Sequence, residues 1–401
     1  MNITVSTPSR PQIRLEAEHA PTSGIVDVAN YGRLKENLIP LWVGEGDLPT
    51  PAFICDAATR SLAAGETFYT WQRGIPELRN ALARYCERLY GSPTDPNRFF
   101  VTSGGMHALQ IAIRMVAGAG DEVLIPTPSW PNFAGGSVIA GAHPVSVPMT
   151  FGSKGWTLDV DDLEKAVTPR TRALFINSPG NPTGWVASQS ELQAILDLAR
   201  RHGLWIVSDE IYARFVFDPA LTIDGRAPSF HDIMEPDDRI VFVQSFSKNW
   251  AMTGWRVGWL EAPAEFGQII ENLIQYSSSG TPVFNQRAAV AALEQGESFV
   301  VRQIERARAG RDLVCAGLAA TGLVEIVPPP GSFFAFFRVR GADNSRDAAI
   351  RLVDEANVGL APGSAFGDAG EGALRLCFAR KAEDLEEAVR RLAKALPLIA
   401  R

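Results

Sequence analysis

Short, continuously apolar runs alternate with longer amphipathic stretches along most of the chain. The runs 173–176 (Ala-Leu-Phe-Ile) and 204–207 (Leu-Trp-Ile-Val) are typical of strands buried on both faces of a parallel sheet. Between them, Ser188 and Glu191 have the spacing of a capping box, which predicts the start of a helix, and Gly203 is placed to end it. The alternation predicts an α/β fold with a mainly parallel sheet wrapped by helices.

The pattern changes near residue 282. A long charged helical stretch at 285–317 precedes an aromatic, strand-like run at 333–337, and helical patterns return at 345–356 and 382–398. This order is typical of a separate α+β unit. We therefore expect a large domain over 46–281 and a smaller α+β domain over 282–401.

Composition narrows the class of protein. The chain has 401 residues, which suits two domains, and its net charge of −7 argues against a nucleic-acid partner. No apolar run is long enough for a membrane span, and residues 1–14 lack the apolar core of a signal peptide. The cysteines and histidines are scattered without metal-ligand spacing, so we expect no metal site, reduced thiols and a cytoplasmic location.

The most informative run is 245–256, Ser-Phe-Ser-Lys-Asn-Trp-Ala-Met-Thr-Gly-Trp-Arg. Lys248 offers an amine that can capture an aldehyde, while Ser245, Ser247 and Arg256 offer ligands for a phosphate. Pyridoxal phosphate (PLP) requires both. Taken alone, the run is more often a surface lysine and arginine beside a turn, so the interpretation depends on further motifs.

Two motifs supply groups that the ring of this cofactor requires. Asp209 lies two positions after the run 204–207, and α/β sheets place ligand chemistry at such strand ends. Its carboxylate can keep a pyridine nitrogen protonated, although a helix cap is an equally good interpretation of the residue alone. Tyr212 can donate to the phenolic oxygen of the ring, as can Asn181 from the Pro- and Gly-rich turn 177–184.

Gly104 and Gly105 indicate an anion site between the strand-like run 99–101 and the helical run 108–116. Glycines at a helix entrance expose backbone N–H groups where the helix dipole favours an anion. Two glycines alone are weak evidence, and the run is neither a dinucleotide-binding loop nor a P-loop.

In this order, the motifs resemble the class I/II aminotransferases of PLP fold type I. The resemblance covers essentially the whole chain and rests on Tyr69, Gly104, Gly105, Met106, Trp130, Asn181, Asp209, Tyr212, Lys248, Arg256 and Arg375. It implies PLP as cofactor, an amino acid and a 2-oxo acid as substrates, and a homodimer with shared active sites. It also implies that the N-terminal segment 1–45 packs against the smaller domain.

The resemblance assigns a role to each of these positions. Lys248 carries PLP and moves the proton at the substrate Cα, Asp209 binds the ring nitrogen, and Tyr212 and Asn181 contact the ring oxygen. Trp130 stacks on the ring. The phosphate ligands are Ser245, Ser247, Arg256, the loop of Gly104, Gly105 and Met106, and Tyr69 from the partner subunit.

Substrate binding is assigned to Gly44, Asn181 and Arg375. Arg375 alternates with apolar neighbours in a probable strand, where an unpaired charge is costly to bury. A bidentate grip on the substrate α-carboxylate would satisfy it, and a structural ion pair is the alternative.

Two other functions remain open. A PLP-dependent C–S β-lyase on the same scaffold would differ only in its products, ammonia and pyruvate instead of a new keto acid. A non-catalytic regulator with an aminotransferase-like domain would carry an additional DNA-binding module, for which we expect no room before the first motif.

The amino donor is the least determined feature. Aspartate enzymes of one related subgroup carry a lysine where this chain has Met106, so we expect neutral or aromatic donors over aspartate, with glutamate and 2-oxoglutarate as one pair. Trp71, Phe133 and Phe334 are candidates for an apolar side-chain pocket. In the competing hypothesis, Arg33 supplies the missing charge and aspartate is preferred.

Overall fold

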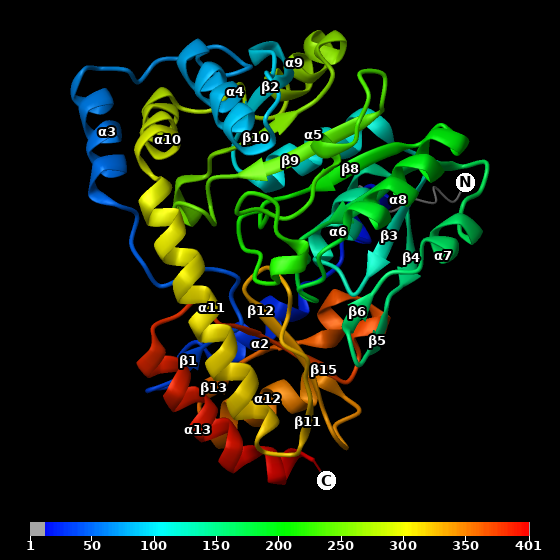
Figure 1. Cartoon of the computed structure of the whole chain (residues 1–401), viewed down its shortest axis with the longest axis vertical. Helices are drawn as coiled ribbons and strands as arrows, with labels where there is room; N and C mark the ends of the chain where they lie inside the picture. The colour runs from blue at the N-terminus through cyan, green and yellow to red at the C-terminus, as the bar shows by residue number, and fades with distance from the viewer. Residues whose placement is uncertain (1–12, 401) are drawn as a thin grey trace, which may run out of the picture.

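The computed structural model describes residues 13–400, and its larger part is built on a seven-stranded sheet (Figure 1). The order is β2-β10-β9-β8-β7-β3-β4, and only β10 runs against the other strands. The strands are β2 (Phe99–Thr102), β3 (Glu122–Thr127), β4 (His143–Pro148), β7 (Thr171–Asn177), β8 (Trp205–Asp209), β9 (Ile240–Ser245) and β10 (Gly258–Glu261). The expected mainly parallel sheet is confirmed.

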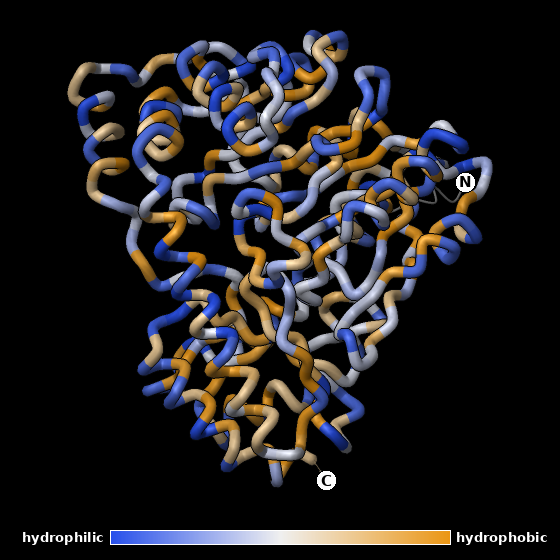
Figure 2. Tube along the Cα trace, viewed as in Figure 1, coloured by the Kyte–Doolittle hydropathy of each residue, from blue (hydrophilic) through white to orange (hydrophobic). Residues whose placement is uncertain are grey.

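Helices flank this sheet, and their apolar faces supply much of the core. They are α3 (Ala52–Ala63), α4 (Pro76–Tyr90), α5 (Gly105–Val116), α6 (Pro131–Ala140), α7 (Val160–Lys165), α8 (Gln189–His202), α9 (Gly267–Gln275) and α10 (Val283–Gln295). Helix α8 begins at Ser188 with both halves of the capping box and ends at Gly203 in the left-handed conformation, as predicted. Apolar residues concentrate along the central strands, whereas polar residues dominate the outer turns of the helices (Figure 2).

The smaller part, at the bottom of Figure 1, contains a four-stranded antiparallel sheet of order β11-β12-β15-β14. Its elements are β11 (Val324–Glu325), β12 (Phe334–Val339), β14 (Ala361–Pro362), β15 (Ala373–Cys377), α11 (Glu297–Ala319), α12 (Ser345–Ala356) and α13 (Ala382–Ile399). From the N-terminal side, α2 (Gly24–Gly32) packs on α12, and β1 (Ile39–Pro40) pairs with β13 (Val358–Gly359). The remaining elements are α1 (Leu15–Glu18) and a hairpin of β5 (Thr150–Gly152) and β6 (Gly155–Thr157).

The charged helical stretch expected at 285–317 is helical in the structure, where it forms two helices that separate at Gly296. A Cβ at this position would lie 2.6 Å from the Trp250 indole, so the close approach of another segment requires glycine here. Helix α10 packs on α3 and α4, while α11 runs from there into the smaller part (Figure 1). The domain limit at residue 282 stays a prediction.

The topology brings distant segments to one edge of the large sheet. Parallel strands β7, β8 and β9 all end there, so Asn177 lies opposite Asp209 and Ser245 follows on the next strand. Because β10 is antiparallel, Gly258 at its start lies beside Thr102 at the end of β2. Within residues 13–400, no helix is both long and apolar enough to cross a bilayer.

Candidate active site

A cavity of about 570 Å³ opens at this sheet edge, where the larger part meets α2 and the smaller part. It brings together most of the expected site residues, namely Gly44, Gly105, Met106, Trp130, Asn181, Asp209, Tyr212, Ser245, Ser247, Lys248, Arg256 and Arg375. Residues as far apart in the sequence as Gly44 and Arg375 therefore line one cavity.

Lys248 lies beyond the end of β9, and its Nζ donates a hydrogen bond to the Gly44 carbonyl at 2.5 Å. Burial lowers the pKa of this amine from 10.5 to about 8. About a tenth of the Lys248 side chains are therefore uncharged at pH 7, far more than at an ordinary lysine. The uncharged amine is the form that attacks an aldehyde or accepts a proton.

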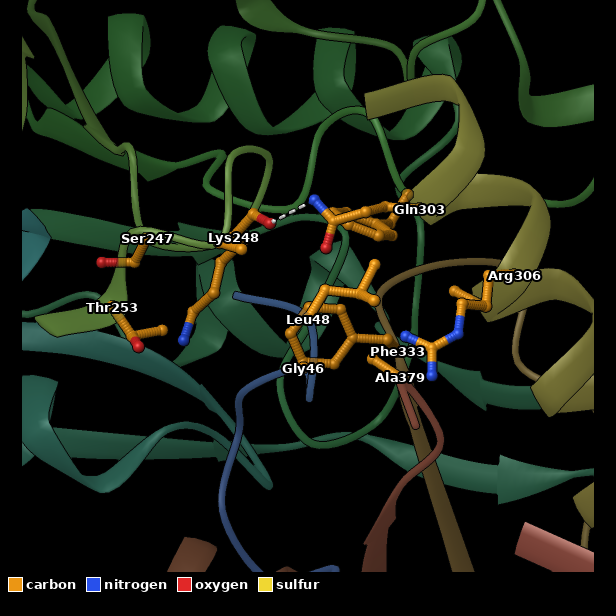
Figure 3. Close-up of a pocket in the computed structure, with 12 residues that line it drawn as sticks. Gly46, Leu48, Ser247, Lys248, Thr253, Gln303, Arg306, Phe333 and Ala379 are labelled. Atoms are coloured by element: carbon orange, nitrogen blue, oxygen red, sulfur yellow. Dashed lines mark hydrogen bonds between the residues drawn. The ribbon is translucent and has the colours of Figure 1, made fainter. Parts of the chain in front are cut away.

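A second, smaller cavity of about 30 Å³ lies on the other side of Lys248, against α11 (Figure 3). The Gln303 side-chain N–H donates to the carbonyl oxygens of Lys248 at 3.3 Å and Asn249 at 2.6 Å. One turn further along α11, Arg306 pairs with Asp47 at 2.5 and 2.8 Å. Helix α11 thus contacts both the main chain of Lys248 and the segment that follows Gly44.

Asp209 is 2% exposed at the end of β8. Burial raises the pKa of its carboxyl group to about 7, while a hydrogen bond from the Ile211 backbone N–H at 3.2 Å opposes that shift. No α-helix follows directly, so the carboxylate caps a turn and faces the cavity. A cationic ring nitrogen beside it would restore its ionised form.

Arg375 is 2% exposed on β15 and has no carboxylate partner within residues 13–400. Its guanidinium donates to Asn181 Oδ1 at 2.8 Å and to the Trp42 carbonyl, and it lies over the rings of Phe334 at 4.4 Å and Phe366 at 4.8 Å. Burial lowers its pKa to about 10, so it is a cation at pH 7. The alternative of a structural ion pair therefore finds no support in the described part of the chain.

An anion cradle forms where β2 leads into α5. Gly104 has φ +88°, and a Cβ there would lie 2.5 Å from the Arg256 guanidinium. A Cβ at Gly258 would lie within 2.9 Å of the Gly105 nitrogen, so the two backbones touch. Ser245 donates to the Ser247 hydroxyl at 2.9 Å beside them. The hydroxyls, the cation and the free amides of a helix start suit a phosphate.

Tyr212 and Trp130 are the aromatic residues of the cavity that the sequence singled out. Tyr212 packs edge-on against Phe333 and Phe334, with ring centroids 5.0 and 5.7 Å apart. Burial raises its pKa, so the phenol keeps its proton and acts as a donor. Trp130 is the N-cap of α6 and contributes its side chain to the cavity wall.

Five expected residues do not line this cavity, namely Tyr69, Trp71, Gly104, Phe133 and Phe334. Gly104 lies behind it, packed on Arg256. The expectation that Trp71, Phe133 and Phe334 line it is wrong, because Phe133 stacks on Phe175 in the core at 3.6 Å and Phe334 packs beneath Arg375. Trp71 lies instead in a surface groove with Tyr69, which is 94% exposed.

Other cavity residues were not expected from the sequence. Helix α2 and the residues around it contribute one wall, made of Ser23, Ile25, Val26, Ala29 and Arg33. Only Arg33 had been considered, because nothing local marks a helix 200 residues before the lysine motif as part of its site. Glu45, which accepts from the Thr253 hydroxyl at 2.9 Å, and Asn132, whose amide points to the Met106 sulfur at 3.4 Å, were also missed.

Comparison with known proteins agrees with this architecture. Residues 36–392 match the family described as aminotransferase class I and II, so the chain belongs to this family of PLP-dependent enzymes and is an aminotransferase. Its sequence is 37% identical to an aspartate aminotransferase of Pyrococcus abyssi, over 90% of this chain and 92% of that protein.

Two further relatives differ in their named substrates. An aromatic-amino-acid aminotransferase of Thermococcus litoralis is also 37% identical, over 90% of this chain and 92% of the relative. The solved structure of the aspartate aminotransferase from Thermus thermophilus with maleate has a TM-score of 0.88 at 33% identity, covering 96% of this chain and all of that one.

Proposed function

We propose that this aminotransferase holds PLP on Lys248 and moves an amino group between an L-amino acid and a 2-oxo acid, with glutamate and 2-oxoglutarate as one pair. The observation that carries the proposal is the buried Arg375 cation, which has no carboxylate partner in the described chain and shares one cavity with the Lys248 amine and Asp209. An amino acid supplies the missing carboxylate and places its amine on the side of the lysine.

PLP, when bound, supplies an electron sink for the substrate Cα. Asp209 would hold the proton of the ring nitrogen, while the Tyr212 hydroxyl and the Asn181 amide would donate to the ring oxygen. Lys248 would take the proton from the substrate Cα and return it, and such general acid–base catalysis contributes about 10²–10⁴-fold. Arg375 would orient the substrate by its carboxylate.

The phosphate would bind in the cradle between β2 and β10. The hydroxyls of Ser245 and Ser247 and the guanidinium of Arg256 line it, and the backbone N–H groups of Gly105 and Met106 open α5 towards it. Trp130 would cover one face of the ring. We assign no step to Tyr69 within its own subunit, because it lies outside the cavity.

The α-carboxylate role can be tested directly. Arg375→Ala should lower kcat/KM for all amino-acid substrates alike. The loss corresponds to about 2–5 kcal/mol of transition-state stabilisation, the cost of truncating a buried charged pair. Arg375→Lys should recover part of the loss, because ammonium keeps the charge but lacks the planar fork. Equal wild-type activity on decarboxylated amines would contradict this role.

For the other substrate pair we propose a neutral or aromatic amino acid. The apolar residues Ile25, Val26 and Ala29 line the same cavity as Met106 and support an apolar side chain. Arg33 lies on the same wall without a carboxylate partner in residues 13–400, and we propose that it receives the distal carboxylate of glutamate.

A panel of amino acids with 2-oxoglutarate or pyruvate as acceptor tests this choice. Phenylalanine should exceed aspartate in kcat/KM, and Arg33→Ala should weaken glutamate while leaving phenylalanine unchanged. If aspartate exceeds the others by more than about tenfold, or 1.4 kcal/mol, the preference is wrong and Arg33 serves aspartate. Release of ammonia and pyruvate from a cysteine conjugate would indicate the C–S β-lyase instead.

A further inference from the structure

His107 lies in the first turn of α5, directly after the glycine loop that is proposed to bind the phosphate. Its Nδ1 lies 3.1 Å from the backbone nitrogen of Ser103, and its Nε2 lies 2.8 Å from the Ser277 hydroxyl. The imidazole therefore bridges the residue before Gly104 and the turn that follows α9.

The partners determine which ring nitrogen carries the proton. A backbone N–H only donates, so Nδ1 of His107 accepts from Ser103 and carries no proton. The Ser277 hydroxyl donates to the Leu273 carbonyl at 2.6 Å, so its oxygen is free to accept from Nε2. The arrangement is complete only with a neutral imidazole protonated at Nε2.

The surroundings favour this neutral form. Burial lowers the pKa of His107, and the charge of Arg114 on the same helix lowers it further. From the turn after α9 the uncharged Ser277 hydroxyl faces the ring, and no carboxylate within the described residues forms an ion pair with the ring.

The bond to Ser103 acts on the geometry of the loop. Gly104 follows at φ +88° and packs on Arg256, and the Gly104 carbonyl accepts from the Thr102 hydroxyl at 3.1 Å. Ser103 is thus held by His107 at one end of the turn and Arg256 packs behind it, while Gly105 and Met106 line the cavity.

We propose that His107 is a positioning residue for cofactor binding: as a neutral imidazole it fixes the Ser103–Gly104 turn and so orients the amides of Gly105 and Met106 towards the phosphate. The proposal rests on the function proposed above. It assigns His107 no contact with the substrate or the cofactor.

The same bridge reaches the exposed surface. Ser277 follows α9, whose Gln275 accepts a hydrogen bond from Gln72 at 2.8 Å. Gln72 belongs to the segment that carries Tyr69. The phosphate loop is thus connected through His107 to the surface groove around Tyr69.

The test is the rate of PLP release from the holoenzyme, followed by loss of its visible absorbance in the presence of an excess of an apo-protein that captures free PLP. His107→Leu removes the acceptor, and we expect release about tenfold faster, the effect of losing one buried hydrogen bond. His107→Asn places an amide oxygen where Nδ1 was, and we expect it to release PLP at close to the wild-type rate.

His202→Leu is the matched control, because His202 is exposed at the end of α8 and pairs only with Glu164. It should release PLP at the wild-type rate. If His107→Leu does not fold, Ser277→Ala replaces it, since that variant frees the ring from its second partner and should accelerate release to a lesser extent.

Equal release from His107→Leu and His107→Asn would overturn the proposal, whether both are fast or both match the wild type. A general packing role would not be rescued by asparagine, which is smaller than leucine and polar. Failure of the proposed function would look different, because the wild-type protein would then bind no PLP or carry it on another lysine.

Discussion

Burial shifts the pKa values of three side chains around the cavity. Lys248 and Asp209 have pKa values of about 8 and about 7, so neither is held firmly in one state near neutral pH. Arg375, with a pKa of about 10, stays charged. A cationic ring nitrogen would keep Asp209 ionised, a free carboxylate would pair with Arg375, and an aldehyde would react with the Lys248 amine, which is why the cavity fits PLP together with an amino acid.

The lowered pKa of Lys248 has a measurable consequence. In the apo-protein, the rate of PLP capture should rise with pH and level off above about 8, because the neutral amine is the attacking species. A lysine at the ordinary value of 10.5 would continue to gain reactivity well beyond that pH. Borohydride reduction followed by peptide mapping identifies the labelled residue.

Lys248→Ala is the control and should capture no PLP while keeping its fold, since the role of the side chain is chemical. A rate that still climbs above pH 10 would contradict the depressed pKa. A label on another lysine would contradict the assignment of Lys248 itself.

Sequence motifs predicted the site residues near the ends of strands, because the apolar run before each residue identifies the strand. Lys248, Asp209 and Asn181 all follow strands that an apolar run predicts. The contact between Lys248 and Gly44 joins residues 204 positions apart, and no local pattern encodes it. Phe133 shows the opposite error, since an aromatic residue expected in a side-chain pocket has its ring stacked on Phe175 in the core.

At the scale of elements, α11 connects the two parts of the molecule and touches Lys248 from behind (Figure 3). Gln303 and Arg306 lie one helical turn apart, so one face of α11 holds the lysine main chain and the segment 44–47 together. The sequence predicted helix here but not its contact, because a glutamine and an arginine on a charged helix are typical of a solvated face.

Gln303→Glu tests this arrangement without changing the size of the side chain. A carboxylate would face the carbonyl oxygens of Lys248 and Asn249 in place of an N–H donor. We expect kcat to fall about tenfold or more, because the two hydrogen bonds from the Gln303 side chain are lost and the new carboxylate repels the carbonyl oxygens. PLP content, measured by absorbance, should remain complete.

Glu305→Gln is the control, because Glu305 is exposed on the same helix. Its kcat should equal that of the wild type. If Gln303→Glu also retains wild-type kcat, the contact of α11 with the lysine backbone has no role in the alignment of the amine.

At the scale of the whole molecule, the large sheet and the smaller antiparallel sheet were predictable, because hydrophobic periodicity differs between their segments. The packing at the break between α10 and α11 was not, since the Trp250 indole that leaves no room for a side chain there lies 46 positions before Gly296 in the sequence. Glycine is a poor helix former and so indicates a helix boundary locally, but its contact with Trp250 cannot be read from the neighbouring residues.

A homodimer with shared sites stays a prediction, and exposed aromatic side chains support it. Tyr69 is 94% exposed, as are Phe68 at 83% and Tyr276 at 88%, although large apolar side chains rarely face water in groups. Inactive Lys248→Ala protomers mixed with Tyr69→Phe protomers should regain one complete site per mixed dimer, measured as PLP affinity and turnover.

Mixing two samples of the same variant is the control and should restore nothing. The expectation fails if the mixture performs only as the sum of its components. It fails equally if the wild type sediments as a fully active monomer.

The reversed direction of β10 also affects how the molecule is made. Gly104 and Arg256, which meet behind the phosphate cradle, are synthesised 152 positions apart. At about 5–20 residues per second, a ribosome needs on the order of 10–30 s to pass from one to the other. During most of that interval β2 has no strand beside it, and β9, once made, keeps an edge open to pairing with other chains until β10 follows. The growing polypeptide therefore has to protect a sheet edge until its last large-sheet strand emerges, and it can acquire its cofactor only afterwards.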